Sequence, residues 1–285
     1  MLSILIPAYN EAPSIKQTIE QVQAVMQQSS TVYEIIVIND GSTDETVAQV
    51  EGTGARLISH PSNGGYGRAL KTGMRNAQYD WIAIVDADAT YPLNRLPDLL
   101  SYIPRFDMVV GARKGVNYWG SSAKRVQRLI LGQLITFVVG EKIPDINSGF
   151  RIFRKDIALS HIRQISSGFS FTTTLTLAMF LDEHFVCYIP VEYHKRVGKS
   201  KVKMGRDTLR MLQILVMAIL YYNPLKLFLF LCILDFVIGL IMALVGLLFN
   251  SAVTSFYFFG LTLLVALIIS ALGFVAEVSR GHRLR

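Results

Sequence analysis

The sequence predicts an α/β domain with a mostly parallel, doubly wound sheet, followed by two membrane-spanning helices. Short apolar runs recur through the first 110 residues, and segments with helical periodicity separate most of them. Strands that alternate with helices in this way indicate parallel βαβ units. Near the C-terminus, two almost uncharged stretches each exceed the ~20 residues that the core of a bilayer requires.

Five apolar runs are expected to form the strands of this sheet. They are Leu2–Ile6, Tyr33–Ile38, Arg56–Ser59, Trp81–Val85 and Met108–Val110. The intervening helices are predicted at Ser14–Met26, Ala69–Ala77 and Leu93–Ile103. Because ligands of doubly wound sheets bind beyond the carboxyl ends of the strands, the residues after each run are the candidates for a site.

One expected strand, Trp81–Val85, ends in the acidic segment Asp86-Ala87-Asp88. Two carboxylates one residue apart suit a divalent cation, because Mg²⁺ and Mn²⁺ prefer hard oxygen ligands and are shared with substrate phosphates. The alternative is a helix N-cap followed by a solvated aspartate. Polar segments also follow three other strands: Pro7-Ala8-Tyr9-Asn10-Glu11, Asn39-Asp40-Gly41-Ser42 and Gly111-Ala112-Arg113. Polar chemistry is therefore expected along one edge of the sheet.

Two common nucleotide-binding motifs are not matched. Gly64-Gly65-Tyr66-Gly67 lacks the G-x-G-x-x-G spacing and does not follow the first strand, which argues against a dinucleotide-binding oxidoreductase. Lys71-Thr72 is preceded by Leu70, where a P-loop requires glycine. The glycines instead favour a tight turn into the following helix.

The net charge of +7 is spread unevenly along the chain. Residues 1–111 hold 7 Lys or Arg and 12 Asp or Glu, whereas residues 112–226 hold 18 and 7. The basic block adjoins the apolar stretches, as expected for contact with an anionic lipid surface or a phosphorylated lipid. Nucleic acid is not expected as a partner, because no recognition motif is present and a membrane anchor disfavours it.

The C-terminal part is predicted to lie on and in a membrane. Basic segments with an apolar face, at about residues 121–139 and 204–224, suit interfacial amphipathic helices, although their apolar faces could instead pack on the sheet. Membrane spans are predicted at about 227–249 and 252–276. Basic residues precede the first span and follow the second, so the positive-inside rule places the large domain and both termini in the cytoplasm.

Four further features of the sequence carry expectations. Leu2–Ile6 is too short and lacks the basic leader of a signal peptide. Asp235 is the one charge inside the expected spans, and we expect a structural bond to the hydroxyl of Thr262 or Ser270, or to another subunit. The two cysteines are expected to be reduced structural thiols without metal spacing. The five histidines are scattered, at 60, 161, 184, 194 and 282, and suggest no catalytic cluster.

Seven motifs in order resemble family 2 glycosyltransferases of GT-A fold, and specifically the polyprenyl-phosphate glycosyltransferases typified by dolichol-phosphate mannosyltransferase. The motifs are Ile6-Pro7-Ala8-Tyr9-Asn10-Glu11, Val37-Ile38-Asn39-Asp40-Gly41-Ser42, Asn63-Gly64-Gly65-Tyr66-Gly67, Asp86-Ala87-Asp88, Gly111-Ala112-Arg113, Asn147-Ser148-Gly149-Phe150-Arg151 and Gly198-Lys199-Ser200-Lys201. The resemblance covers residues 1–203, which are expected to form the catalytic domain, and the apolar region 225–285 resembles the two-helix anchor of bacterial members.

The resemblance implies roles for the donor-side residues. A nucleotide-sugar would be held by Pro7, Tyr9, Glu11, Asp40, Asp86, Ala87 and Asp88. Asp88 would be the more direct ligand of Mg²⁺ or Mn²⁺, with Asp86 beside it. Thr90 stands where many relatives carry Gln beside the metal, and could offer a hydroxyl. Glu11 and Asp40 could instead cap helices.

On the acceptor side, the resemblance implies a set of cations and one hydroxyl that bind a lipid phosphate. The set is Arg113, Ser148, Arg151, Arg196, Lys199 and Lys201. Arginine suits this task because its guanidinium binds phosphate through two parallel hydrogen bonds. Arg113 follows a strand end directly and joins Asp86 and Asp88 as an expected catalytic residue. Each cation could alternatively be solvated or bind lipid headgroups.

The function expected from the resemblance is transfer of one sugar from a UDP- or GDP-linked donor to undecaprenyl or dolichyl phosphate at the cytoplasmic membrane face. A lipid monophosphate has a second pKa near 6, by analogy with phosphorylated side chains, so it can attack without a general base. The first alternative is an enzyme of the same fold that glycosylates a hydroxyl, and the second is a non-catalytic membrane scaffold. The expected partners are the donor, the lipid phosphate and membrane lipids; a second copy of the chain is left open.

Overall fold

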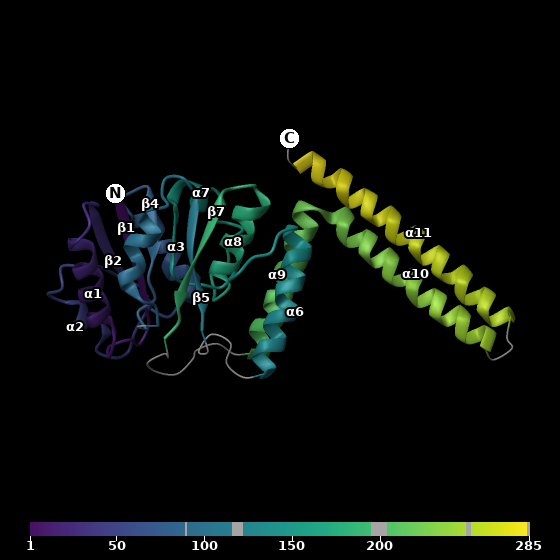
Figure 1. The fold of residues 1–285 in the computed structure, drawn as a ribbon, viewed down its shortest axis with the longest axis horizontal. Coiled ribbons are helices and arrows are strands. Elements are labelled where there is room, and N and C mark those ends of the chain that lie inside the picture. Colours follow the sequence, from purple (N-terminus) through teal and green to yellow (C-terminus); the bar gives the residue numbers. More distant parts are fainter. Residues whose placement is uncertain (89, 116–121, 195–203, 249–251, 284–285) are drawn as a thin grey trace. The chain divides into compact units, whose positions relative to one another are not determined.

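The computed structural model describes residues 1–88, 90–115, 122–194, 204–248 and 252–283. The chain divides into two compact units, Met1–Thr208 and Leu209–Arg285. The first unit contains a seven-stranded sheet with helices on its faces, and the second consists of long helices (Figure 1).

The sheet has the strand order β3-β2-β1-β4-β6-β5-β7. Its strands are β1 (Leu2–Ala8), β2 (Tyr33–Asn39), β3 (Arg56–Ser59), β4 (Trp81–Ile84), β5 (Met108–Lys114), β6 (Arg151–Arg154) and β7 (Val186–Glu192). Only β6 runs against its neighbours, β4 and β5, so the predicted mostly parallel sheet is confirmed.

Strands β6 and β7 were not expected from the sequence. Strand β6 is four residues long and carries arginine at both ends, so it contains no apolar run long enough to indicate a strand. Strand β7 contains Pro190, and it lies at the edge of the sheet, where a residue without an N–H is tolerated.

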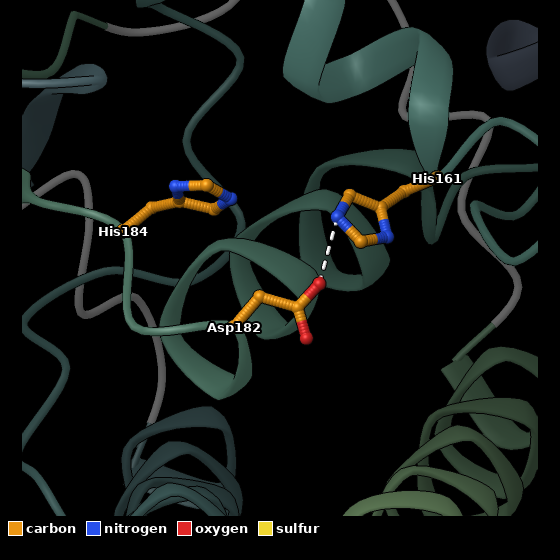
Figure 2. A group of neighbouring side chains, drawn as sticks. All are labelled: His161, Asp182 and His184. Carbon is orange, nitrogen blue, oxygen red and sulfur yellow. Dashed lines mark ion pairs between the residues drawn. The ribbon is translucent and has the colours of Figure 1, made fainter. Parts of the chain in front are cut away.

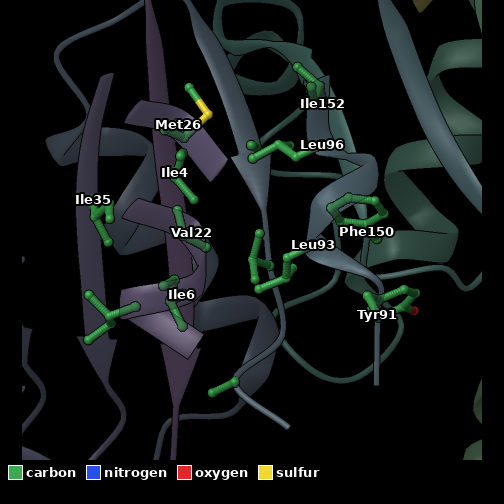
Figure 3. Close-up of a cluster of buried hydrophobic side chains, with 14 of the residues drawn as sticks. Ile4, Ile6, Val22, Met26, Ile35, Tyr91, Leu93, Leu96, Phe150 and Ile152 are labelled. Carbon is green, nitrogen blue, oxygen red and sulfur yellow. The ribbon is translucent and has the colours of Figure 1, made fainter. Parts of the chain in front are cut away.

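Helices cover both faces of the sheet and enclose two hydrophobic cores. Alternation along β1 explains the division, because Ile4 and Ile6 face one core whereas Leu5 faces the other. In the first core, Val22 and Met26 of α1 join Ile4 and Ile6 (Figure 3). The helices of this unit are α1 (Ile15–Gln27), α2 (Thr46–Val50), α3 (Tyr66–Asn76), η1 (Leu93–Arg95), α4 (Leu96–Leu100), α6 (Ser122–Val139), α7 (Lys155–Ser160) and α8 (Phe171–Leu181).

Helix α6 coincides with the amphipathic helix predicted at 121–139. Val126, Leu129 and Ile130 are each more than half exposed, whereas Ile135 and Val138 are buried. The helix therefore presents an apolar surface to its surroundings. Its contact with a membrane stays a prediction.

The register of the central strands aligns the expected motifs. Ala8 at the end of β1 pairs with Asn39 at the end of β2, and Leu5 pairs with Ile84 at the end of β4. The backbone N–H of Asp40 also donates to the carbonyl of Ala8 at 2.8 Å. The segments that follow β1, β2 and β4 thus begin at the same edge of the sheet.

The second unit is built on two long apolar helices, α10 (Pro224–Leu248) and α11 (Ala252–Arg283), preceded by α9 (Met204–Tyr222). Two segments are long and apolar enough to cross a membrane, Pro224–Leu248 and Ser255–Arg280. Glycines allow α10 and α11 to pack closely, since a Cβ at Gly239 or Gly246 would collide with a residue of α11.

The bond expected for Asp235 is not formed within the part of the chain that the structure describes. The hydroxyls of Thr262 and Ser270 donate to the helix carbonyls of Phe259 and Ala266, both at 2.8 Å. The Oδ2 oxygen of Asp235 is buried and has no hydrogen-bond partner there. The expected bond within the chain is absent because both hydroxyls have a carbonyl of their own helix within reach. The alternative, a bond from Asp235 to another subunit, stays a prediction.

Candidate active site

The loops that follow β1 and β2 are joined by side-chain to backbone hydrogen bonds. Asn10, in a left-handed conformation at φ 51°, accepts a hydrogen bond from the Thr43 N–H through Oδ1 at 2.8 Å and donates its own N–H to Ser42 at 3.0 Å. The N–H of Glu11 donates to the Thr46 hydroxyl at 2.9 Å. Two segments that the sequence assigned to the nucleotide are therefore held side by side.

The expected nucleotide-binding residues at β1 differ in exposure. Pro7 is buried within the strand, whereas the side chains of Tyr9 and Glu11 beyond the strand are half-buried. Pro7 thus supports the strand end, and Tyr9 and Glu11 lie nearer the surface at the edge where the site is expected.

Asp40 organises the glycine turn that begins α3. Its buried carboxylate accepts hydrogen bonds from the N–H groups of Gly64 and Gly65, at 2.9 and 2.8 Å, and contacts the Nδ1 atom of His60 at 2.7 Å. Gly65 has a φ of +96°, which favours glycine. Asp40 thus holds the start of α3, close to the alternative of helix capping that the sequence offered. The contact with His60, which is 20 residues away, was not expected.

Asp86 lies beyond the end of β4, half-buried, and its carboxylate is oriented by its neighbours. The hydroxyl of Tyr66 donates to Oδ1 at 2.8 Å. Burial raises the pKa of Tyr66 far above its ordinary value, and the charge of Asp86 raises it further, so Tyr66 remains a donor at neutral pH. A Cβ at Gly149 would collide with the same carboxylate, so a larger residue there would displace Asp86 from this orientation.

Asp88 is almost fully buried and is held by Thr90. The Oδ1 oxygen of Asp88 accepts hydrogen bonds from the Thr90 hydroxyl at 2.6 Å and from the Thr90 N–H at 3.2 Å. Thr90 thus supports the Asp88 carboxylate, and a contact of its hydroxyl with the metal stays a prediction. Ala87 between the two aspartates is buried in the first core.

The acidic pair fits a divalent cation by its donor chemistry. Asp86 and Asp88 offer carboxylate oxygens from one strand end, and hydrogen bonds to one oxygen of each, from Tyr66 and Thr90, fix their orientation. Gly149 leaves room for the Asp86 carboxylate. Oriented hard oxygen donors of this kind suit Mg²⁺ or Mn²⁺.

Arg113, near the end of β5, forms a two-point ion pair with Asp145. The guanidinium Nε and Nη2 donate to the two carboxylate oxygens at 2.7 and 2.9 Å, and the Arg113 N–H adds a third bond at 3.1 Å. Burial alone would raise the pKa of Asp145, but the charge and hydrogen bonds of Arg113 hold it below its ordinary value. The guanidinium also lies 5.3 Å from the ring centre of Tyr193.

Asp145 was not singled out from the sequence. It stands two residues before the Asn147 of an expected motif, and its carboxylate also accepts the N–H of that residue at 3.1 Å. An acidic residue so close to a motif was the available signal. The pairing with Arg113 joins positions 32 residues apart and follows only from the fold.

Arg151 is fully buried, which corrects the expectation that it binds a lipid phosphate. Its Nη1 donates to the Thr172 carbonyl at 3.1 Å and to the Thr176 hydroxyl at 2.8 Å. Its Nε donates to the Ser148 carbonyl at 2.8 Å, and Nη2 donates to the carbonyls of Ile146 and Ser148. All five N–H bonds are therefore used inside the protein, and none remains for a phosphate.

Ser148 is likewise an interior residue. Its hydroxyl donates to the Gly111 carbonyl at 2.6 Å and accepts the Phe150 N–H at 3.3 Å, and the side chain is fully buried. The geometry thus gives Ser148 a structural role in place of the expected phosphate contact. Three further expected phosphate-binding residues, Arg196, Lys199 and Lys201, lie outside the described residues.

Comparison with curated proteins finds relatives that are named as sugar transferases. The chain is 30% identical over 212 residues to Agl6, a hexosyltransferase of low-salt glycan biosynthesis from Haloferax volcanii, covering 72% of this chain and 51% of that protein. It is 27% identical over 228 residues to the dolichyl-phosphate β-glucosyltransferase ALG5C of Trichomonas vaginalis, covering 71% and 66%. The chain thus spans between about half and two thirds of the length of these relatives.

Among solved structures, the chain resembles glucosyl-3-phosphoglycerate synthase from Mycobacterium tuberculosis, crystallised with Mn²⁺, UDP and glucosyl-3-phosphoglycerate. The TM-score is 0.64 at 20% identity, covering 76% of this chain and 79% of that structure. At this identity the likeness shows the fold, which is the GT-A-like α/β fold. A model of glycosyl transferase family 2 matches residues 3–161, more than half of the chain. The chain therefore belongs to glycosyltransferase family 2.

Proposed function

We propose that this protein is a membrane-bound glycosyltransferase that moves one sugar from a nucleotide-sugar to a polyprenyl phosphate. One observation supports the proposal most strongly. This family 2 chain combines the oriented acidic pair after β4 with two helices of membrane-spanning length. One relative is named a dolichyl-phosphate β-glucosyltransferase, which supports a prenyl phosphate as the acceptor.

The donor would bind at the edge where β1, β2 and β4 end. Tyr9, Glu11 and the loop shaped by Asp40 would contact the base and ribose, and Asp86 and Asp88 would hold Mg²⁺ or Mn²⁺ against the diphosphate. The metal, when bound, would neutralise the charge of the leaving nucleoside diphosphate. A solved structure of the same fold was crystallised with Mn²⁺ and UDP, which supports this arrangement.

The chemistry needs no general base from the protein. A lipid monophosphate is largely ionised at neutral pH, so one of its oxygens can form the bond to the anomeric carbon. The bond from that carbon to the diphosphate oxygen breaks, and the nucleoside diphosphate leaves. The protein's own part is to position both substrates and to hold charges in place, with Tyr66 and Thr90 fixing the two aspartates.

Arg113 is our proposal for the contact with the lipid phosphate. Its guanidinium plane is fixed by the two-point pair with buried Asp145 and by the neighbouring Tyr193 ring. A fixed guanidinium at the end of β5 is suited to a phosphate that enters at the same edge of the sheet. Arg196, Lys199 and Lys201 are proposed as further contacts.

The membrane arrangement is also a proposal. Pro224–Leu248 and Ser255–Arg280 would together form a hairpin that spans the membrane. The catalytic unit and both termini would then lie in the cytoplasm. The basic residues that flank these segments support this orientation, because cytoplasmic loops carry an excess of Lys and Arg. Helix α6, with its exposed Val126, Leu129 and Ile130, would lie at the membrane surface.

The test compares matched acceptors with the purified full chain. A panel of UDP- and GDP-sugars is offered with polyprenyl phosphate or with the polyprenol of the same length, in the presence of Mg²⁺ or Mn²⁺. We expect transfer to the phosphate and none to the alcohol. Transfer to hydroxyl acceptors alone would favour the alternative enzyme, and a lack of UDP and GDP binding would favour the scaffold.

A further inference from the structure

A group of metal-ligating side chains lies outside the candidate active site, among histidines that are distant in the sequence. His161, Asp182 and His184 each bring one ligand atom within 4.8 Å of the others. The Nε2 atom of His161 lies 2.8 Å from Oδ2 of Asp182. In Figure 2 the two imidazole rings extend toward each other, with the Asp182 carboxylate close to His161.

The backbone builds this group at the ends of two helices. His161 is the C-cap of α7, and Asp182 is the C-cap of α8. The N–H of His184 returns to the Met179 carbonyl at 2.9 Å, and Glu183 between the two ligands has a φ of 60°. This reversal of the chain at a non-glycine residue presents Asp182 and His184 on the same side as His161.

The group lies at the amino ends of β5 and β7, whereas the candidate active site lies at the carboxyl ends of the parallel strands. His184 comes just before β7, and its Nδ1 lies 3.8 Å from the carboxylate of Asp107, which comes just before β5. Arg113, in contrast, is near the other end of β5. Arg113 is six residues further along the chain than Asp107, which is about 20 Å at ~3.3 Å per residue of strand.

The hydrogen bonds around His161 suit a ligand of a metal ion. Its Nδ1 faces Oε1 of Gln164 at 2.9 Å, and its Nε2 faces the Asp182 carboxylate. When Nδ1–H donates to Gln164, Nε2 presents its lone pair on the side of Asp182. A cation could then be bound by the imidazole nitrogen and the carboxylate oxygen together. The hydrogen bond from Nδ1 to Gln164 would fix the orientation of the ligating imidazole ring.

We propose that His161, Asp182 and His184 form a binding site for a first-row divalent metal ion of the zinc class. Two imidazoles and one carboxylate are a common three-ligand set for Zn²⁺, with water in the fourth position. The Asp182 and His184 side chains are 33% and 29% exposed, so an ion can enter from solvent. Tetrahedral zinc ligands lie about 3.4 Å apart. The 2.8 Å contact between His161 and Asp182 must therefore open by about 0.6 Å, and wider separations in the group, which are at most 4.8 Å, must close by up to about 1.4 Å.

The bound ion would join the C-termini of α7 and α8 to the segment that leads into β7. It differs in chemistry from the ion proposed at Asp86 and Asp88, because imidazole ligands select transition metals over Mg²⁺. The proposal therefore does not depend on the proposed sugar transfer. The alternative is that His161 and Asp182 form a plain ion pair.

The experiment titrates Zn²⁺ into the metal-stripped full chain in the presence of excess Mg²⁺, and uses Co²⁺ absorption to report the coordination. We expect one equivalent of Zn²⁺ with a Kd tighter than about 10 µM, and a thermal midpoint that rises with the ion. His161→Gln and His184→Gln should each weaken binding at least about tenfold, and Asp182→Asn should act in the same direction.

Two control variants test whether the one equivalent of bound Zn²⁺ lies in the group formed by His161, Asp182 and His184. His194→Gln removes an exposed histidine outside it, and the double variant Asp86→Asn/Asp88→Asn removes the other candidate site; both should retain the bound Zn²⁺. Metal-free melting curves show that each variant is folded. Zn²⁺ binding that is lost in the double variant but kept in His161→Gln, or no stoichiometric binding at all, overturns the proposal.

Discussion

The two sides of the candidate active site use their charged residues in different ways. On the donor side, at the ends of β1, β2 and β4, Asp40 holds backbone N–H groups, and Asp86 and Asp88 are oriented by hydroxyls. On the acceptor side, Arg113 pairs with a buried aspartate, and Arg151 donates to interior carbonyls. A cation in a motif is therefore not always available to a ligand.

The largest effect is expected on the donor side, from Asp88→Asn. Losing a metal-binding carboxylate leaves the diphosphate charge uncompensated, which costs several kcal/mol in the transition state, or a loss of about 100-fold or more in the rate of transfer. Asp86→Asn should weaken donor binding and lower the rate less. Rates and donor KM are measured over a range of Mg²⁺ concentrations.

A matched control for this variant is Asp98→Asn, which removes a half-exposed carboxylate paired with Arg95 at 2.7 Å on the surface. Its transfer rate should stay near the wild-type value. A normal rate in Asp88→Asn, or undiminished activity in EDTA, would contradict the metal role of the acidic pair.

The second effect concerns stability and separates the two arginines. Arg151→Ala removes the donor of five hydrogen bonds to buried acceptors, so we expect a loss of about 3–5 kcal/mol and a fall of about 10 °C in the thermal midpoint. Arg154→Ala, at the other end of β6, removes a cation that is 46% exposed and should change the midpoint little. A stable Arg151→Ala protein with a raised KM for lipid phosphate would restore the original expectation.

Asp145→Asn tests the pair on the acceptor side through its pH dependence. Because the folded pKa of Asp145 is lowered, its contribution to stability is fully present above the ordinary value of about 3.9 and is lost as the pH falls through the folded value. The variant should be less stable than wild type by about 3 kcal/mol at neutral pH. The difference should shrink only below about pH 4 in melting curves; shrinkage between pH 6 and 7 would contradict the assignment.

Arg113→Lys keeps the positive charge but loses the two-point geometry. We expect the KM for lipid phosphate to rise by about 10-fold or more, in line with one charge-assisted hydrogen bond of about 1.5–3 kcal/mol, while the donor KM changes little. Steady-state kinetics with each substrate varied in turn measure both values. A rise in the donor KM alone would place Arg113 on the other side of the site.

The smallest effect is expected from Tyr66→Phe. This change removes one hydrogen bond to Asp86, worth about 1 kcal/mol, and should slow transfer about threefold to tenfold without a change in the fold. The loss should disappear in the Asp86→Asn background, because the two residues act through the same contact. Equal losses in both backgrounds would show that Tyr66 acts elsewhere.

The sequence predicted the parallel part of the fold and the alignment of the motifs at one edge of the sheet, because β1, β2 and β4 are largely apolar runs followed by polar residues. It missed β6, whose four residues begin and end with arginine, and with it the burial of Arg151. Contacts between distant positions, such as Arg113 with Asp145 and His161 with Asp182, depend on the packing of the sheet and helices. No local pattern in the chain encodes them.

The most direct test of the central claim is mass spectrometry of the lipid product together with identification of the released nucleotide. The proposed reaction joins the sugar to the single phosphate of the polyprenyl lipid and releases a nucleoside diphosphate. We predict a polyprenyl monophosphate sugar and UDP or GDP in equal amounts. A polyprenyl diphosphate sugar with release of a nucleoside monophosphate, or no lipid product with any donor, would contradict the account.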